Sequence, residues 1–332
     1  MLSEINPHEK DVLLTFEDKG HRYLYVPLMQ PVPVSVTGLI KLVVDPFDGA
    51  GIVHKRFTAW SKDPTNKYYT LIEYLLHVQK LSRADAEKEI LNLWDSKGKI
   101  AAEAGTQMHQ DLQDFWNQKL EAPTVVAEPP QHIVAMLGIF EWYHLEKDLQ
   151  PFRVEMRVVL TAKDDKGVDV PVAAGTIDAV FKSSDGCYYL FDWKRQDPVT
   201  KGKLGVPSDK PASSFKQPMC KAPFHEYQQT DLTKYSIQMG IYSYILEAQY
   251  GMSIASRALV QIHPSLGSRA HVIEALDLRE EVDAFMRLQI AKALRVNRLK
   301  NAEAMGRVPT AADLVPACVA WRNGEVLADS DF

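Results

Sequence analysis

The feature that most constrains the fold is a change in sequence character at Pro151. Three segments beyond it, 152–160, 172–181 and 188–193, are rich in the β-branched and aromatic residues that strands favour. Charged spacers that contain glycine, which is typical of turns, separate the three segments. Because these connections are short, we expect consecutive segments to pair as a three-stranded antiparallel meander.

The rest of the chain predicts mostly helices around this meander. Ser82 with Asp85, and Asp277 with Glu280, have the spacing of helix capping boxes. Gly251 is expected to end the helix that precedes it. The expected elements are a hairpin over 14–25, a mostly helical stretch over 53–145 that includes helices at 82–94 and 133–145, a helix over 232–250, a strand over 258–263 and a helix over 278–299. This order indicates a mixed α/β fold rather than a repeated βαβ series.

Length and composition narrow the class of protein. At roughly 150 residues per domain, the chain makes one large or two small domains. We expect an N-terminal hairpin with a helical region over 1–98, a core over 99–300 and a C-terminal tail over 301–332. The net charge of −5 excludes a uniformly basic nucleic-acid-binding chain. No apolar run approaches the ~20 residues that span a bilayer, and the N-terminus has no apolar signal segment, so we expect an intracellular protein that is neither secreted nor bound to a membrane.

The residues with the clearest chemistry lie on the last two strands of the meander. A three-residue turn over 184–186, with Gly186 in the left-handed position, would place Asp178 directly opposite Asp192. Their Cβ atoms would then lie roughly 5 Å apart. Lys194 is two residues beyond Asp192 and therefore on the same face of its strand.

Two opposed carboxylates repel unless a proton, a cation or solvent neutralises them. A hard divalent cation such as Mg²⁺ or Mn²⁺ prefers oxygen ligands, and it can activate water and clamp a phosphate. Lys194 could hold the attacking water or stabilise the charge that develops on phosphate. The spacing therefore suits hydrolysis of phosphodiesters, although the same residues could form a solvated hairpin with a surface Asp–Lys pair.

Four more residues are candidates for the site, and each could instead have an ordinary structural role. His109 could supply an imidazole ligand, which would suit Mn²⁺, or it could be an ordinary packing or surface residue. Gln238 and Tyr242 are four apart on one helix face and could touch nucleic acid or the lysine, or belong to the core. Glu155 lies in mid-strand as an ordinary edge residue or as a second-shell acid behind the metal.

Four short motifs occur in order over about half the chain. They are Gly105-Thr106-x-x-His109, Gly175-Thr176-Ile177-Asp178, Asp192-Trp193-Lys194 and Gln238-x-x-x-Tyr242. Together they resemble the PD-(D/E)xK nuclease superfamily, and within it the RecB-like exonuclease branch, which includes the CRISPR adaptation nucleases and the mitochondrial genome maintenance exonuclease. The segment Ser35–Ile40, followed by Phe47-Asp48, also resembles an N-terminal signature of this branch.

The resemblance implies an αβββαβ core and metal-dependent hydrolysis of DNA. Asp178 and Asp192 would bind the metal together with His109 and the backbone carbonyl of Trp193, and Lys194 would be the catalytic lysine. Gln238 and Tyr242 would lie near the active site and the DNA. Some relatives hold an iron–sulfur cluster with four cysteines, but this chain has only 3, far apart, so no cluster is expected.

A local excess of positive charge fits this interpretation. The segment 194–221 has seven basic and two acidic residues, a net of +5 in a chain of net −5. Such a stripe beside a metal site is typical of a phosphate-backbone binder, or it is a solvated charged loop. The residues expected to contact nucleic acid are Thr106, Arg195, Lys201 and Lys203, with Gln238 and Tyr242. Trp60, Trp116 and Trp142 could stack on bases, but buried positions are the better expectation.

The leading hypothesis is thus a metal-dependent DNA exonuclease that acts from single-stranded ends in replication, repair or recombination. The alternatives are a structure-specific endonuclease of the same fold and a non-catalytic nucleic-acid-binding subunit. A structural subunit that joins a helicase or other replication proteins is a further, weaker alternative. Since the sequence has no phosphate-binding loop, it is not expected to contain a helicase motor of its own.

Overall fold

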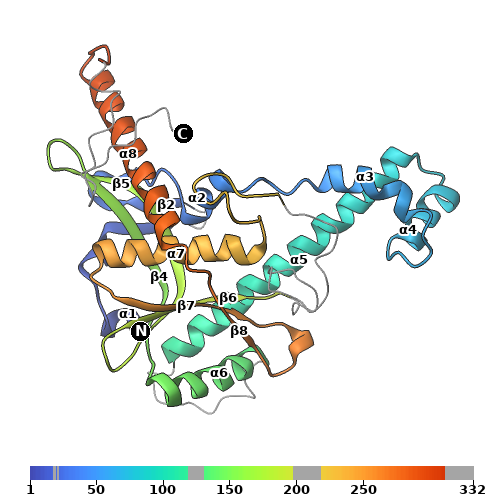
Figure 1. Ribbon diagram of the computed structural model, residues 1–332, viewed down its shortest axis with the longest axis horizontal. Helices are drawn as coiled ribbons and strands as arrows, with labels where there is room; N and C mark the ends of the chain where they lie inside the picture. Colours follow the sequence, from blue (N-terminus) through green and yellow to red (C-terminus); the bar gives the residue numbers. More distant parts are fainter. Residues whose placement is uncertain (18–19, 21, 119–130, 197–217, 311–332) are drawn as a thin grey trace. The chain divides into compact units, whose positions relative to one another are not determined.

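The computed structural model describes residues 1–17, 20, 22–118, 131–196 and 218–310 (Figure 1). The chain forms two compact units, one of residues 1–45 and 111–332 and the other of residues 46–110. The sequence led us to expect domain boundaries near residues 98 and 300. The observed division differs, because the N-terminal hairpin belongs to the same unit as the large sheet.

The larger unit is built on a five-stranded sheet of order β4-β5-β6-β7-β8. The meander is confirmed: β4 (Gln150–Lys163), β5 (Asp169–Lys182) and β6 (Tyr188–Lys194) pair antiparallel in sequence order. The strand β7 (Ile254–Gln261) is parallel to β6, because a helix connects the two, and β8 (His271–Glu274) pairs antiparallel with β7. The fold is therefore mixed α/β, as expected.

The N-terminal hairpin is also confirmed. A short α1 (Leu2–Ile5) precedes β1 (Leu14–Glu17), which pairs antiparallel with β2 (Arg22–Tyr25) in a three-stranded sheet completed by β3 (Gln30–Pro31). Its apolar side chains pack onto β4 and β5, and the buried residues of that cluster are Leu14, Tyr23, Tyr25, Val159 and Ala174. The hairpin thus covers part of the large sheet.

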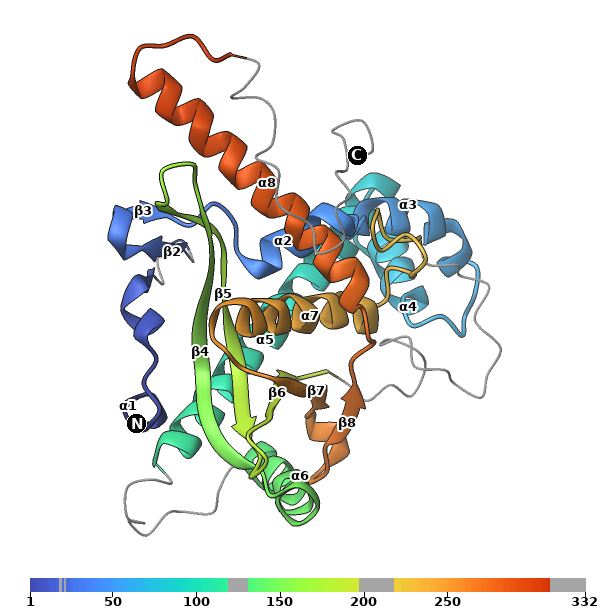
Figure 2. The same ribbon diagram turned by 60° about the vertical axis from the view of Figure 1, so that its left-hand side comes forward.

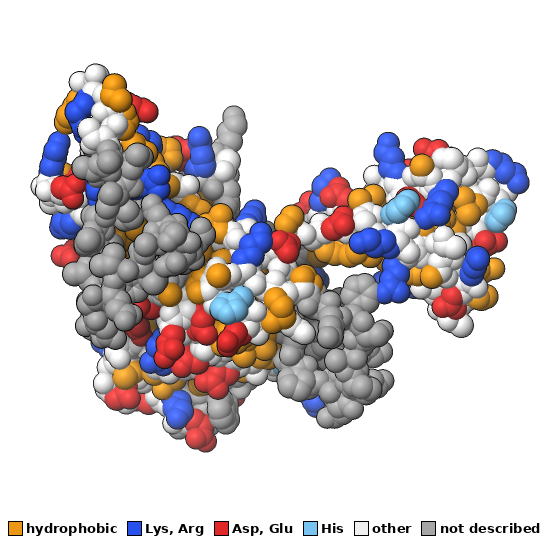
Figure 3. Space-filling view, turned by 45° about the horizontal axis from the view of Figure 1, so that its top comes forward, with side chains coloured by type: hydrophobic (Ala, Val, Ile, Leu, Met, Phe, Trp, Pro, Cys, Tyr) orange, Lys and Arg blue, Asp and Glu red, His pale blue; other side chains and the backbone are white. Residues whose placement is uncertain are grey.

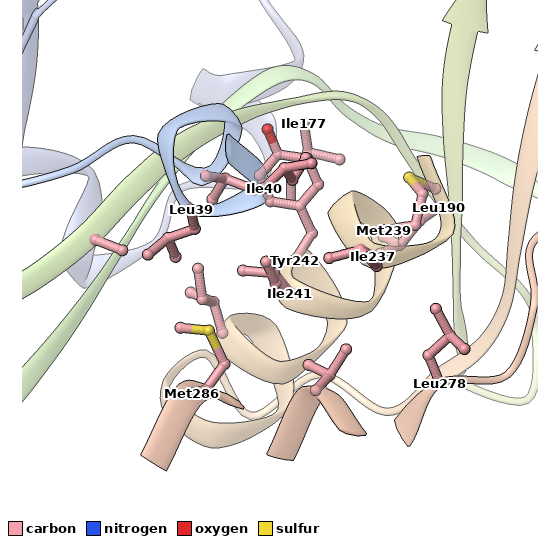
Figure 4. Close-up of a cluster of buried hydrophobic side chains, with 14 of the residues drawn as sticks. Leu39, Ile40, Ile177, Leu190, Ile237, Met239, Ile241, Tyr242, Leu278 and Met286 are labelled. Atoms are coloured by element: carbon pink, nitrogen blue, oxygen red, sulfur yellow. The ribbon is translucent and has the colours of Figure 1, made fainter. Parts of the chain in front are cut away.

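One face of the large sheet carries α7 (Asp231–Gln249), with α2 (Val36–Val43) and α8 (Arg279–Ala304) packed beside it (Figures 1 and 2). Ser35 caps α2 by accepting a hydrogen bond from the Gly38 N–H at 3.0 Å. Figure 4 shows the core that joins these helices to β5 and β6. The residues labelled there are Leu39, Ile40, Ile177, Leu190, Ile237, Met239, Ile241, Tyr242, Leu278 and Met286.

An aromatic cluster fills the opposite face, under α6 (Gln131–Lys147) and the C-terminal turns of α5 (Arg83–Gln118). Phe140 of α6 stacks on Phe181 of β5 with ring centroids 4.2 Å apart, and Trp116 of α5 meets both rings edge-on. Because successive strand residues alternate between faces, Phe181 points to this side and Val180 to the α7 side.

The smaller unit is helical. It comprises α3 (Gly49–Trp60), α4 (Tyr69–Glu73), a π-helical turn over Tyr74–Val78 and the first part of α5. Its buried residues are Val53, Phe57, Ile72, Leu75, Ala86 and Ile90. The rings of Trp60, Tyr68 and Trp94 pack around this core, and the Trp94 indole N–H donates to the Tyr68 hydroxyl at 2.8 Å. Trp60 and Trp116 therefore serve packing, whereas the side chain of Trp142 lies outside the described residues.

Several element boundaries differ from the expectations. The helix predicted over 82–94 begins after Ser82, whose hydroxyl accepts from the Asp85 N–H, but it continues to Gln118. The cap predicted at Asp277 is wrong: Leu278 is the N-cap of α8, and the Asp277 carboxylate instead accepts from Arg257 at 3.0 Å. The strand predicted over 258–263 starts earlier, at Ile254, and β8 was not expected.

Candidate active site

The hairpin register around the two aspartates agrees with the turn chemistry. Gly186 has φ 88°, in the left-handed region, and its N–H donates to the Ser183 carbonyl at 3.0 Å. The ladder of β5 with β6 includes the pair Ala179 and Phe191, which is one step before Asp178 and Asp192. The two aspartates therefore follow directly where the paired ladder ends.

Asp178 is held at this end of the ladder by the backbone of β6. The Trp193 N–H donates to Oδ2 of Asp178 at 2.7 Å. A backbone donor of this kind stabilises the ionised carboxylate and fixes its orientation. Trp193 therefore orients Asp178 through its N–H, and the metal contact expected of its carbonyl stays a prediction.

Asp192 and Lys194 form a largely buried ion pair. The Lys194 Nζ lies 2.6 Å from Oδ2 of Asp192, and their side chains are 16% and 3% exposed. Burial alone would lower the pKa of Lys194, but the negative charges of Asp192 and Asp178 outweigh it and raise the pKa. Both carboxylates therefore favour the charged form of Lys194. The register, in which Ala179 pairs with Phe191, brings Asp178 and Asp192 to the same side of the sheet.

Glu155 of β4 lies beside Asp178 in the larger unit. One carboxylate oxygen of each residue lies within 4.8 Å of the other, and both residues are half-buried. Two such carboxylates form a donor set that fits Mg²⁺ or Mn²⁺. His109, which the sequence predicts as an imidazole ligand, is half-buried on α5 among the last residues of the smaller unit, and its contact with a metal stays a prediction.

Glu155 has an unusual backbone for a strand residue. Its φ of 47° is left-handed in the middle of β4, where the residues on either side of it pair with the neighbours of Asp178. A residue with a side chain pays roughly 1–2 kcal/mol for this conformation, and such strain clusters at functional sites. The sequence suggested an edge residue or an acid behind the metal ligands, but the Glu155 carboxylate lies beside that of Asp178 and could itself be a ligand. Asp192 is paired with Lys194, and its predicted contact with a metal stays a prediction.

Tyr242 closes the site from α7 and is buried (Figure 4). Gln238, one turn earlier, donates to its hydroxyl at 3.5 Å. Burial, with the charges of Asp178 and Asp192, raises the pKa of Tyr242 well above its ordinary value. The backbone of Gly175 makes this packing possible, since a Cβ there would lie 2.7 Å from the Tyr242 ring and 2.9 Å from Val36.

Tyr235 was not expected in the site. The Lys194 ammonium lies 4.3 Å from the centre of its ring, and its hydroxyl accepts from Gln196 at 3.0 Å. A signal was present in the sequence, because Tyr235, Gln238 and Tyr242 have the i, i+3, i+7 spacing of one helix face.

The residues expected to contact nucleic acid are only partly described. Thr106 is exposed, and its hydroxyl donates to the Ala102 carbonyl one turn back in α5. Arg195 is half-buried at the end of β6, whereas Lys201 and Lys203 lie outside the described residues. Figure 3 shows basic and acidic side chains interspersed over the face in view.

The comparisons with known proteins add little. No protein-family model matches the sequence, and no curated protein does. A solved structure that matches, "Crystal structure of SSO0001", has 15% identity and a TM-score of 0.24. The match covers 46% of this chain and 55% of that one, so the chain spans about half the length of that protein. A likeness at this TM-score carries no argument about fold or function.

None of the described helices is long and apolar enough to cross a membrane.

Proposed function

We propose that the protein is a metal-dependent deoxyribonuclease, an exonuclease that hydrolyses phosphodiester bonds from single-stranded ends, on a PD-(D/E)xK core. The observation that carries this proposal is the convergence of Asp178, Asp192 and Lys194 where the β5–β6 ladder ends, with Glu155 beside Asp178. The order of β4, β5, β6, α7 and β7, with α6 before them, is compatible with the expected αβββαβ core.

Glu155 and Asp178 would hold the metal ion, because their carboxylates are close enough to share one cation. The sequence adds His109 as a further ligand, and an imidazole nitrogen beside oxygen donors would suit Mn²⁺ at least as well as Mg²⁺. When bound, such an ion supplies Lewis acidity to a phosphate oxygen and lowers the pKa of a water molecule.

The protein's own residues supply orientation and charge. The Trp193 N–H keeps the Asp178 carboxylate in one orientation, which prepares it for a cation. Lys194, paired with Asp192 at 2.6 Å, would serve as an electrostatic stabiliser of the phosphate in the transition state. Asp192 holds this ammonium at the end of β6.

A nuclease assay with matched substrates tests the proposal. End-labelled linear single strands and double strands, and a circular single strand, are incubated with Mg²⁺ or Mn²⁺, with and without a chelator. The exonuclease proposal predicts progressive shortening of the linear single strand, an intact circle and no reaction with the chelator. A cleaved circle would instead favour the endonuclease, and intact substrates with every ion would contradict the proposal.

A further inference from the structure

Tyr235 of α7 contacts the lysine of the site but has no part in the chemistry described so far. Its ring centre lies 4.3 Å from the Lys194 Nζ, within the distance of about 6 Å at which a cation is attracted to an aromatic face. Tyr235 is half-buried, so this attraction is less weakened by water than it would be at an exposed position.

Two described residues contact the Lys194 ammonium from different elements. Asp192 comes from the same strand and Tyr235 from the helix that covers it. An ammonium on a four-carbon stem has about 2 kcal/mol of rotamer entropy, so one partner alone would leave its position poorly defined. Two partners fix the direction of the charge.

The hydroxyl of Tyr235 is bound by the segment that follows β6. Gln196, two residues after Lys194, donates from Nε2 to this hydroxyl at 3.0 Å. The stretch 194–196 therefore holds the tyrosine at its hydroxyl and presents the lysine to its ring.

A ring also differs from a carboxylate in what it does to the charge. A further carboxylate in place of the Tyr235 ring would neutralise the ammonium more and weaken its attraction for a phosphate. The neutral ring attracts the ammonium through its quadrupole and leaves the positive charge available.

We propose that Tyr235 is a positioning residue, which holds the Lys194 ammonium over its ring so that the charge faces the phosphate in the transition state. This inference rests on the proposed function, since it assigns Tyr235 a role in the same reaction.

The kinetic test is a graded pair of substitutions. Tyr235→Leu removes the ring and is expected to lower kcat about threefold to thirtyfold with little change in KM, whereas Tyr235→Phe keeps the ring and stays within about threefold of the wild type. Tyr244→Leu is the matched control, because Tyr244 lies on the same helix beside Asp283 and Arg287. It is expected to leave kcat unchanged.

A double variant separates positioning from a structural effect. In a Lys194→Ala background, Tyr235→Leu should cause no further loss of kcat, because the group that it positions is absent. A Tyr235→Leu variant as active as the wild type would overturn the inference. So would a loss of the same size in both backgrounds.

A spectroscopic test does not depend on catalysis. The ε-methylene protons of Lys194 should resonate upfield in the wild type and in Tyr235→Phe because of the ring, and should move downfield in Tyr235→Leu. An unchanged resonance in Tyr235→Leu would overturn the inference whatever the activity. An inactive wild type would end the proposed function and this role together, whereas an active wild type with a fully active Tyr235→Leu would end only the role of Tyr235.

Discussion

Asp192 and Lys194 each lose most of their contact with water, so each depends on the other. Removing one partner of a buried ion pair leaves the other charge buried and uncompensated, whereas replacing both partners with neutral groups need not destabilise the protein. We therefore expect Asp192→Asn and Lys194→Met each to lower the free energy of unfolding by about 3 kcal/mol, and the double variant to recover most of it. Urea unfolding of the four proteins measures this, and additive losses would contradict the pairing.

Glu155 has a strained backbone, which destabilises the fold, and a carboxylate that the proposed metal site needs. Glycine adopts a φ of 47° without the cost of a Cβ, so Glu155→Gly should be up to about 1 kcal/mol more stable without metal. It should also lose metal-dependent activity. Glu155→Gln keeps the strain and loses the charge, which makes it the control. A destabilised Glu155→Gly, in urea unfolding with a chelator present, would show that the conformation is not strained.

At the scale of elements, α2, β5 and α7 meet at Gly175. A Cβ there would lie 2.7 Å from the Tyr242 ring, so Gly175→Ala must displace α7 or the ring and should cost about 1–3 kcal/mol. Gly138→Ala is the control: nothing lies within 4 Å of its Cβ position in the middle of α6, and alanine there should stabilise the helix by about 0.5–1 kcal/mol. Equal thermal shifts in the two variants would contradict this packing.

The sequence-based predictions were accurate where structure depends on residues close together in sequence, and failed where it depends on distant ones. The β5–β6 register was predictable because the turn that sets it is local and contains Gly186. The sequence did not reveal that Asp277 fails to cap α8, because its carboxylate accepts a hydrogen bond from Arg257, which is 20 residues away in sequence. The length of α5 was also missed, since its interior glycines cost only about 1 kcal/mol each and a long helix can bear them.

The same distinction applies to the candidate site. The spacing of Asp178, Asp192 and Lys194 on two adjacent strands was enough to bring them together. The position of Glu155 depends on a left-handed backbone conformation, which a glutamate in the sequence does not predict. The contact of Tyr235 with Lys194 depends on how α7 packs on the sheet. These two features are tertiary and could not be derived from local pattern.

At the scale of the whole molecule, metal binding and folding should be linked. An ion that binds only the folded chain stabilises it by about 2.7 kcal/mol at a concentration of 100 Kd. We expect Mn²⁺ to raise the thermal unfolding temperature of the wild type but not that of Glu155→Gln or Asp178→Asn. A control variant with an intact site, Glu247→Gln on the exposed side of α7, should respond like the wild type. Equal responses from all four proteins would place the ion elsewhere.

The measurement that tests the central claim most directly is cleavage of an end-labelled single strand in Mn²⁺ by the wild type and by the double variant Asp192→Asn with Lys194→Met. If these residues carry the chemistry, the wild type shortens the strand and the folded double variant is slower by at least about a hundredfold. Equal rates for the two proteins, or a strand left intact by the wild type, would contradict it.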